Sequence, residues 1–447
     1  MTTNLEYYRK QAKALLAAAK AGDAAAVERI QRYSPKLALN GAQLTIAREA
    51  GFASWTKLKL ATLDFVKAAK SDRKRAEEML AAHPELAHGG LHAALVLGDT
   101  ARVAELMADT PASDAMIHVC FSRFANPQSG RAGKLVEIAR LLLERGADPN
   151  AAFNDPNWPD NPLPCLYGAS GVNNNPELTR VLLEAGANPN DGESLYHSTE
   201  HPDHACLRVL LEHGARPDKV NVVNHILDHE DVEGLRLLID AGADLRAGNA
   251  RGETPLHWAV WRRRSAAIVG MLLDRGSEVN ALRNDGRTAY ALAMATGQTE
   301  IAAFLESRGA DTTVPPLGAR PDDHRLLPDL TISHSTAAVE ALLAAGVPVD
   351  TRGENGGTAL HWACWKGYAD IVRILLAHGA SLSIEDNVFH GTPPGWFGHG
   401  IRNCGEREGD YAGVARELVA AGATFPKADF PCEIEEVDRV LRMAGVI

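Results

Sequence analysis

A cluster of histidine and glutamate in the middle of the chain has the spacing of a metal or acid–base site. Residues 197–201 read His-Ser-Thr-Glu-His, so two imidazoles are four residues apart and Glu200 lies between them. On a helix these two rings share one face, where they could bind a zinc ion. A glutamate beside the metal could then activate a bound water molecule as a base. Metal-assisted hydrolysis is one interpretation of the motif, with three candidate ligands: His197, His201 and His229. The alternative is a solvated stripe of charged residues.

The same region could also transfer protons without a metal. The H-x-x-E-H pattern resembles the zinc site of the inverzincin metallopeptidases, but the distant helix that carries the third ligand in that family is not recognisable here. We therefore predict no cofactor, with zinc as the alternative. If the chain is an enzyme, Glu200 or Asp228 would be the general base or acid, and His201 and His229 would be proton carriers or ligands. Whether it is an enzyme stays open on the sequence.

Tryptophans form a second candidate set. Five of the seven are Trp258, Trp261, Trp362, Trp365 and Trp396. Residues three apart on a helix share a face, so Trp258 pairs with Trp261, Trp362 with Trp365, and Trp396 with His399. Core packing explains Trp258, Trp362 and Trp396 as well as ligand binding does, because an indole packs well in a core. Trp261 and Trp365 fall at solvent-facing positions, where an exposed indole points to a ligand.

The predicted binding residues occupy these positions or adjoin them. His390 is included because Pro394-Gly395 distorts the following helix start and would place His390 near the other candidates. The full set is Tyr196, Trp258, Trp261, Arg262, Trp362, Trp365, Lys366, His390, Trp396 and His399.

The elements that must position these residues are pairs of helices. Residues 358–386 read TALHWACWKGYADIVRILLAHGASLSIED, which predicts helices over 359–365 and 369–377. Gly379 follows the second helix and suits the left-handed conformation of a helix end. One such pair cannot bury its apolar face alone, so it requires neighbours of the same kind.

Segments of the same form recur along the chain. Many end in stretches such as LLLERGADPN, VLLEAGANPN and MLLDRGSEVN, and helix starts recur as TPLHWAV at Thr254 and TALHWAC at Thr358. This pattern closely resembles the ankyrin repeat, which has a period of about 33 residues and a T-P-L-H start. The resemblance implies an all-α, ankyrin-like solenoid of helical repeats with short β-turn fingers. His257 and His361 belong to the repeated helix start, so we expect them to be structural.

The resemblance also implies how the candidate residues are spread. The first helices of such repeats line a concave groove, and neighbouring repeats stack about 10 Å apart. Trp261 and Trp365 lie three repeats apart in the alignment, so we expect about 30 Å of path between them. The groove should therefore carry two separate patches.

Three regions follow from the repeat pattern. Residues 1–110 are predicted to form a helical N-terminal cap with degenerate repeats, including a leader, LNGAQLTIAREAGFASWTKLK, similar to that of some bacterial ankyrin arrays. Residues 111–390 form the regular array, and residues 391–447 form a terminal repeat with a C-terminal capping helix. Insertions between the helices of a repeat should collect on one edge of the stack. We place such insertions at 125–130, 171–175 and 401–410, and one more in a finger at 155–162.

Composition narrows the class of protein. The chain of 447 residues is 45% hydrophobic and 23% charged, as in soluble proteins, and its net charge of −11 disfavours a general nucleic-acid binder. The six cysteines show no paired spacing, which fits a reducing compartment. No apolar run reaches membrane-span length, and the amino end lacks an apolar signal core. We expect a cytoplasmic protein that does not bind membranes.

Three functions fit these observations. The leading hypothesis is a recognition scaffold that binds a partner protein or a compact small-molecule ligand in a groove lined by tryptophan, histidine and acids. The alternative is an enzyme that uses acid–base or metal-assisted chemistry, such as a hydrolase, with its site in the groove around Glu200, His201, Asp228 and His229. A purely architectural spacer is the third, and the tryptophans weigh against it.

Overall fold

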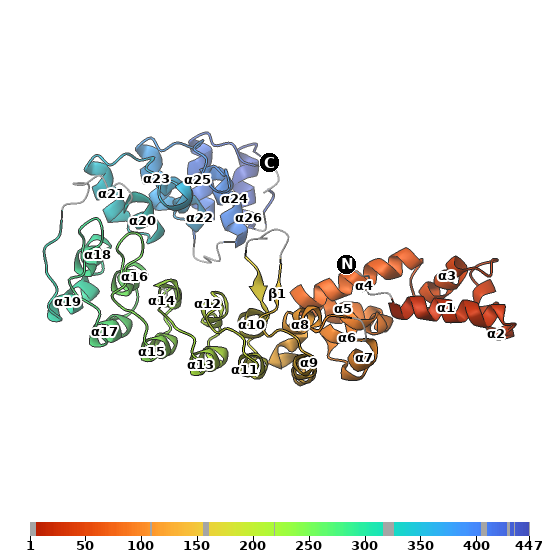
Figure 1. Cartoon of the computed structure of the whole chain (residues 1–447). Helices are drawn as coiled ribbons and strands as arrows, with labels where there is room; N and C mark the ends of the chain where they lie inside the picture. The colour runs from red at the N-terminus through yellow and green to blue at the C-terminus, as the bar shows by residue number, and fades with distance from the viewer. Residues whose placement is uncertain are drawn as a thin grey trace. The chain divides into compact units, whose positions relative to one another are not determined.

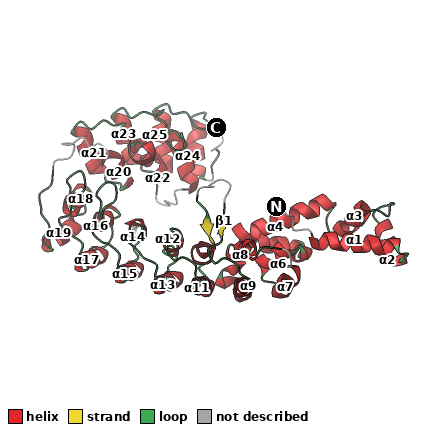
Figure 2. Cartoon of the chain, in the orientation of Figure 1, coloured by secondary structure: helices red, strands yellow, loops and turns green. Residues whose placement is uncertain are grey.

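The computed structural model describes residues 6–107, 110–154, 161–218, 220–315, 326–403, 409–426, 430–432 and 434–446. Nearly all regular structure in these ranges is helical (Figure 2), which confirms the predicted all-α fold of helical repeats. Strands β1 (Ala152–Phe153) and β2 (Leu163–Pro164) form a short antiparallel pair, with Ala152 opposite Pro164. The chain divides into two compact units, residues 1–226 with 233–243 and residues 227–232 with 244–447. The boundaries predicted from the repeat pattern, at 110 and 390, stay predictions.

Helix pairs of the repeat type follow one another through the first unit. Its α-helices are α1 (Glu6–Lys20), α2 (Ala24–Gln31), α3 (Leu39–Glu49), α4 (Trp55–Ser71), α5 (Arg73–Ala82), α6 (Leu91–Leu97), α7 (Thr100–Leu106), α8 (Ala112–Cys120), α9 (Ala132–Glu144), α10 (Cys165–Tyr167), α11 (Pro176–Glu184), α12 (Ser194–Ser198), α13 (Ala205–Glu212), α14 (Val220–Ile226) and α15 (Val232–Asp240), whose first residue belongs to the second unit. Short 3-10 turns are η1 (Pro84–His88), η2 (Arg123–Ala125) and η3 (Pro127–Ser129), and η4 (Gly168–Val172) is a π-helical turn.

The second unit continues the same pattern. Its elements are α16 (Pro255–Trp261), α17 (Ala266–Asp274), α18 (Ala289–Ala295), α19 (Thr299–Ser307), α20 (Leu326–Ile332), α21 (Thr336–Ala344), η6 (Glu354–Gly356), α22 (Ala359–Lys366), α23 (Ala369–Ala377), α24 (Pro393–Asn403), α25 (Tyr411–Ala420) and α26 (Glu435–Met443). The helices predicted at 359–365 and 369–377 are therefore confirmed as α22 and α23.

Repeats pack first helix on first helix and second helix on second. In the second unit α20 packs on α22 and α22 on α24, while α21 packs on α23 and α23 on α25 (Figure 1). Leu327, Leu360 and Phe397 of the first helices are fully buried between these layers. Each helix pair thus buries its apolar face against its neighbours, as an isolated pair could not.

A threonine and a histidine fix the start of the first helix in two repeats. At α22, His361 Nδ1 accepts from the Thr358 backbone N–H at 3.0 Å, and Nε2 donates to the Gly391 carbonyl of the next repeat at 3.1 Å. At α16, His257 Nδ1 accepts from the Thr254 N–H at 3.2 Å, and Nε2 lies 3.3 Å from the Arg287 carbonyl. The structural role predicted for His257 and His361 is confirmed, because each histidine caps its own helix and bonds to the next repeat.

Inserted loops of neighbouring repeats meet in the first unit. Asn126 Nδ2 donates to the Asn173 carbonyl at 3.0 Å, and Asn175 Nδ2 donates to the Ala125 carbonyl at 2.7 Å. The prediction that insertions collect on one edge is confirmed for this pair. Of the other two insertions, residues 155–160 and 404–408 lie outside the described residues.

The glycine that ends α23 gives a direct test of backbone strain. Gly379 has φ +82°, and a Cβ added there would meet no atom within 4 Å. Gly133 in α9 has equally open space but no positive φ. Because only the backbone conformation differs, Gly379→Ala should lower the free energy of unfolding by about 1 kcal/mol, whereas Gly133→Ala should leave it equal or higher. Thermal melts of the two variants check this, and an equal effect at both positions would contradict it.

The capping histidine of α16 predicts a pH dependence of stability. Burial, followed by the nearby Arg283 charge, lowers the pKa of His257 to about 4. The unfolded chain binds this proton near pH 6.5, so the stabilisation is complete above about pH 6.5 and is lost as the pH falls towards about 4. Protonation of Nδ1 would also remove the acceptor of the cap. The melting temperature should therefore fall between pH 7 and pH 5, and His257→Gln should reduce that fall.

A second histidine variant serves as the control for this experiment. His378 is exposed at the end of α23, so His378→Gln should keep the pH dependence of the unaltered protein. If His257→Gln and His378→Gln give the same dependence, protonation of His257 does not limit stability in acid.

Candidate functional site

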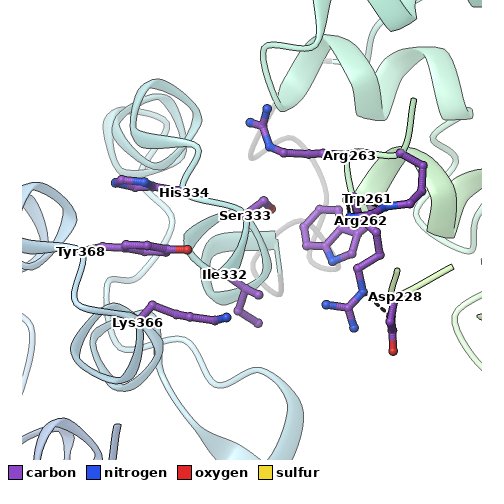
Figure 3. Close-up of a pocket in the computed structure, with 10 residues that line it drawn as sticks. Asp228, Trp261, Arg262, Arg263, Ile332, Ser333, His334, Lys366 and Tyr368 are labelled. Atoms are coloured by element: carbon purple, nitrogen blue, oxygen red, sulfur yellow. Dashed lines mark hydrogen bonds and ion pairs between the residues drawn. The ribbon is translucent and has the colours of Figure 1, made fainter. Parts of the chain in front are cut away.

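Several cationic side chains line one cavity in the second unit. This cavity, called the basic pocket here, has a volume of about 580 Å³. It is lined by residues 261–264 at the end of α16, 332–334 at the end of α20, Lys366 and Tyr368 at the end of α22, and Asp228. Figure 3 shows the Arg262 guanidinium and the Lys366 ammonium pointing towards one another across it. Three helix ends from different repeats thus contribute to one site.

Arg262 is held in place by an acid and a ring. Its Nε lies 2.7 Å from the Asp228 carboxylate, and its guanidinium carbon lies 4.8 Å from the centre of the Trp258 ring. The Trp258 indole N–H donates to the same carboxylate at 3.1 Å. Asp228 and Trp258 therefore orient the guanidinium, which keeps further N–H donors for a ligand.

The two following arginines are bound to the protein itself. The backbone of Arg263 is left-handed, with φ +57°, and its guanidinium donates to the Thr296 carbonyl at 2.9 Å. The Arg264 guanidinium donates to the Arg262 carbonyl at 2.9 Å and lies 3.7 Å from the Glu230 carboxylate. These contacts fix the backbone that carries Arg262.

Aromatic rings complete the lining of the basic pocket. His334 and Tyr368 stack with ring centres 3.9 Å apart and planes at 3°, and His334 Nε2 lies 3.0 Å from the Asp370 carboxylate. Trp261 is half-buried and packs against the apolar core of the later repeats, α20 to α26. Its body is therefore part of the wall of the cavity, and the prediction of a fully solvent-facing indole is too simple.

Lys366 lies closer to Trp261 than uniform stacking of repeats would suggest, whereas the separation of Trp261 from Trp365 stays a prediction. Trp261 and Arg262 share the basic pocket with Lys366, although three repeats separate them in the alignment. The estimate assumed one uninterrupted stack. Residues 316–325, between α19 and α20, lie outside the described residues. Across this segment of the sequence, Arg251 before α16 pairs with Asp329 of α20 at 2.9 Å. Trp365 itself lines a different cavity.

That second cavity, called the tryptophan pocket here, has a volume of about 500 Å³. Trp362, Trp365 and Trp396 line it together with Phe389 and His399. The Trp396 ring stands nearly perpendicular to the other two indoles, at 84° to Trp362 and 69° to Trp365, with ring centres 5.0 Å and 5.8 Å away. Trp365 also stacks on His399 at 5.1 Å. The predicted helix-face neighbours therefore form one aromatic site across two repeats.

A buried carboxylate anchors the tryptophan pocket. Asp386 accepts from the backbone N–H groups of Val388, Phe389 and Gly391 and from the Trp396 indole N–H at 2.9 Å. Burial raises the pKa of Asp386, but these donors outweigh it and lower the pKa to about 2. His390 lies exposed in the same turn, with φ +53°, and does not line the pocket.

The histidine and glutamate motif makes local contacts in the first unit. His197 Nδ1 lies 2.8 Å from the Glu200 carboxylate, and His197 Nε2 lies 3.4 Å from that of Glu193. His201 Nε2 donates to the Gly171 carbonyl at 2.7 Å. The part of the chain described by the structure contains no group of three His, Cys, Asp or Glu side chains that could hold a metal ion.

Tyr196 stacks on a histidine that the sequence did not single out. Its ring centre lies 4.0 Å from that of His225, whose Nδ1 is 2.8 Å from the Thr199 hydroxyl. His225 Nε2 is 3.9 Å from Glu200. His225, like Tyr368 and His334, falls at no distinctive position of the repeat pattern, so no signal in the sequence would have found it.

The four residues proposed for catalysis fall in two compact units. Glu200 and His201 belong to the first, and Asp228 and His229 to the second, where His229 is exposed. Asp228 is engaged by Arg262 and Trp258, as described above. Their grouping as a catalytic site stays a prediction.

Comparison with known proteins identifies the class. A family model described as ankyrin repeats, in three copies, matches residues 223–315 and 330–386. An ankyrin repeat-containing protein of Treponema pallidum (strain Nichols) is 35% identical over 124 residues, which is 27% of this chain and 40% of that protein. Human inversin is 31% identical over 138 residues, or 30% of this chain and 12% of inversin.

The chicken nuclear factor NF-kappa-B p105 subunit is 30% identical over 143 residues, or 32% of this chain and 14% of that protein. The chain thus matches less than half the length of each of these relatives. It is a helical-repeat protein that contains ankyrin repeats, as the sequence predicted. None of its described helices is long and apolar enough to cross a membrane.

Proposed function

We propose that this chain is a scaffold that recognises partner proteins and that its basic pocket binds an acidic stretch of a partner. Ankyrin repeats generally mediate protein–protein interaction, and the repeats matched by the family model include residues on every side of this pocket. The observation that carries the proposal is the convergence of Arg262 and Lys366 on one cavity.

Local charge favours an acidic ligand even though the whole chain is acidic. The net charge is −11, but exposed charges farther away than about 8 Å are largely screened at physiological salt. Within the pocket, the guanidinium of Arg262 can meet a carboxylate with two parallel hydrogen bonds. Trp261 and Tyr368 offer ring surfaces to the aliphatic part of a glutamate side chain.

The size and position of the pocket favour a protein segment. Its volume of about 580 Å³ exceeds that of a single carboxylate group, and three helix ends contribute to it. A small acidic molecule of similar extent is the alternative occupant. No contact of the described residues favours an enzyme over a scaffold, so catalysis at Glu200, His201, Asp228 and His229 stays a prediction for that alternative.

Peptide binding tests the proposal. A fluorescein-labelled decapeptide of alternating glutamate and glycine should bind the full chain at about 0.15 M salt, and the lysine counterpart should not. Arg262→Gln and Lys366→Gln should each weaken binding about tenfold, which corresponds to about 1.4 kcal/mol. Fluorescence anisotropy gives the dissociation constants.

Matched variants make the result specific. Arg145 is exposed at the end of α9 in the first unit, so Arg145→Gln makes the same change of charge outside the pocket and should bind as the unaltered protein does. Equal binding of the glutamate and lysine peptides, or equal affinity of Arg262→Gln and Arg145→Gln, would refute an acidic ligand in this pocket.

A further inference from the structure

The tryptophan pocket has the character of a second recognition site with a different chemistry. Its walls are aromatic, and apolar side chains beside it are exposed to water: Phe389 is 71% exposed and Val388 54%. Large apolar side chains gathered beside an open cavity mark binding surfaces more often than isolated ones do. This pocket is distinct from the basic pocket, because Trp365 and Lys366 are successive residues of α22 that line different cavities.

Two indole N–H groups in this pocket are available as donors. Trp362 Nε1 is buried and has no hydrogen-bond partner among the described residues. The Trp365 indole likewise makes no hydrogen bond within the described part of the chain; its ring contacts are with Trp396 and His399. A buried N–H group normally has an acceptor, so the Trp362 N–H indicates a ligand that brings a carbonyl or hydroxyl oxygen, and the half-buried Trp365 N–H can donate to the same ligand.

A glycine leaves room beside the buried indole. A Cβ added to Gly357 would lie 3.5 Å from Trp362 Nε1 and 3.3 Å from Trp396 Cη2. With no side chain at 357, a small rotation of the Trp362 ring would expose its N–H to an acceptor in the pocket. Gly391 and Gly395 also line the cavity, so the ligand can approach the backbone closely there.

Charge argues against a cationic ligand. An aromatic cage for an ammonium group usually gains from an accessible carboxylate, but no acidic residue lines this pocket among those described. The nearest carboxylate behind its wall, Asp386, is 2% exposed and already accepts four hydrogen bonds. A carboxylate offers about four lone-pair positions, so Asp386 has no capacity left for a ligand.

We infer that the tryptophan pocket binds a proline-rich segment of a partner protein in the polyproline II conformation. Proline rings are apolar and pack on indole faces, and the polyproline II backbone leaves its carbonyl oxygens without internal hydrogen bonds. Those carbonyls would accept from Trp365 and Trp362. Such segments are also extended before binding, so they lose little conformational entropy in an aromatic-lined groove. The inference rests on the general proposal of protein recognition but not on the basic pocket.

Decaproline is the probe, and the full chain is the receptor. Isothermal titration and intrinsic tryptophan fluorescence should show saturable binding at least about tenfold tighter than that of a glycine–serine decapeptide. Trp365→Phe keeps a ring but loses the N–H, so it should weaken decaproline binding severalfold while the melting temperature changes little.

A blocking variant tests the location without removing any tryptophan. Gly395 lies in α24 and has no positive φ, and a Cβ there would meet only Thr392 Oγ1, at 3.6 Å. Gly395→Leu should therefore fold and fill the pocket, which abolishes decaproline binding. Gly133→Leu, at a helical glycine with open space, is the matched control and should bind normally. If Gly395→Leu binds decaproline with the same affinity as Gly133→Leu does, the inference is overturned.

Two further ligands separate the remaining classes. If the chain binds tetramethylammonium but not decaproline, and Gly395→Leu abolishes that binding, the pocket is a cation site and the inference is overturned. If the chain binds maltose with the same pattern, the pocket is a sugar site and the inference is also overturned. Arg262→Gln should leave decaproline binding unchanged. If the chain binds decaproline but not the acidic peptide, that result would therefore count against the basic pocket alone.

Discussion

The ion pair between Arg251 and Asp329 is the interaction on which the basic pocket depends. The two residues are 78 positions apart, and their side chains meet at 2.9 Å. Asp329 is 5% exposed, and a carboxylate removed from water needs a charged or hydrogen-bonding partner to be tolerated. Arg251 precedes the start of α16 and Asp329 lies within α20, so their contact links the repeat that carries residues 261–264 with the repeat that carries 332–334. The basic pocket is lined by residues of both repeats, so it requires that the two repeats stay in contact.

Much of the fold follows from local pattern, and the structure shows which parts. The helices of residues 358–377, the left-handed Gly379 and the capping roles of His257 and His361 depend on interactions within one repeat or with the next. Such interactions leave a periodic signature in the sequence. The meeting of Trp261 and Arg262 with Lys366 leaves none, because it depends on contacts between repeats that are far apart in the sequence, such as that of Arg251 with Asp329. An alignment that assumes uniform stacking therefore places Lys366 too far away.

The candidate site residues also divide into those that the sequence pattern reveals and those that it does not. Trp362, Trp365, Trp396 and His399 were found from i, i+3 spacing and do gather in one pocket, because that spacing and adjacent repeats bring them together. Trp258 is neither simple core nor an open ligand site, since its N–H holds the acid that orients Arg262. Asp386 was not singled out, although it fixes Trp396, because an aspartate in a finger has no sequence feature that distinguishes an anchor from a solvated turn residue. The H-x-x-E-H spacing was chemically specific, yet His201 donates to a backbone carbonyl of the adjoining repeat.

The central claim is that an acidic segment binds in a pocket assembled from repeats on both sides of residues 316–325. The most direct measurement is the affinity of the glutamate–glycine peptide for Arg251→Gln and Arg251→Lys, since Arg251 does not line the pocket. The account predicts that Arg251→Gln weakens binding about tenfold, because the two walls lose their ion pair, and that Arg251→Lys stays within about threefold of the unaltered protein. An Arg251→Gln protein that is folded and binds the peptide as tightly as the unaltered chain would contradict it.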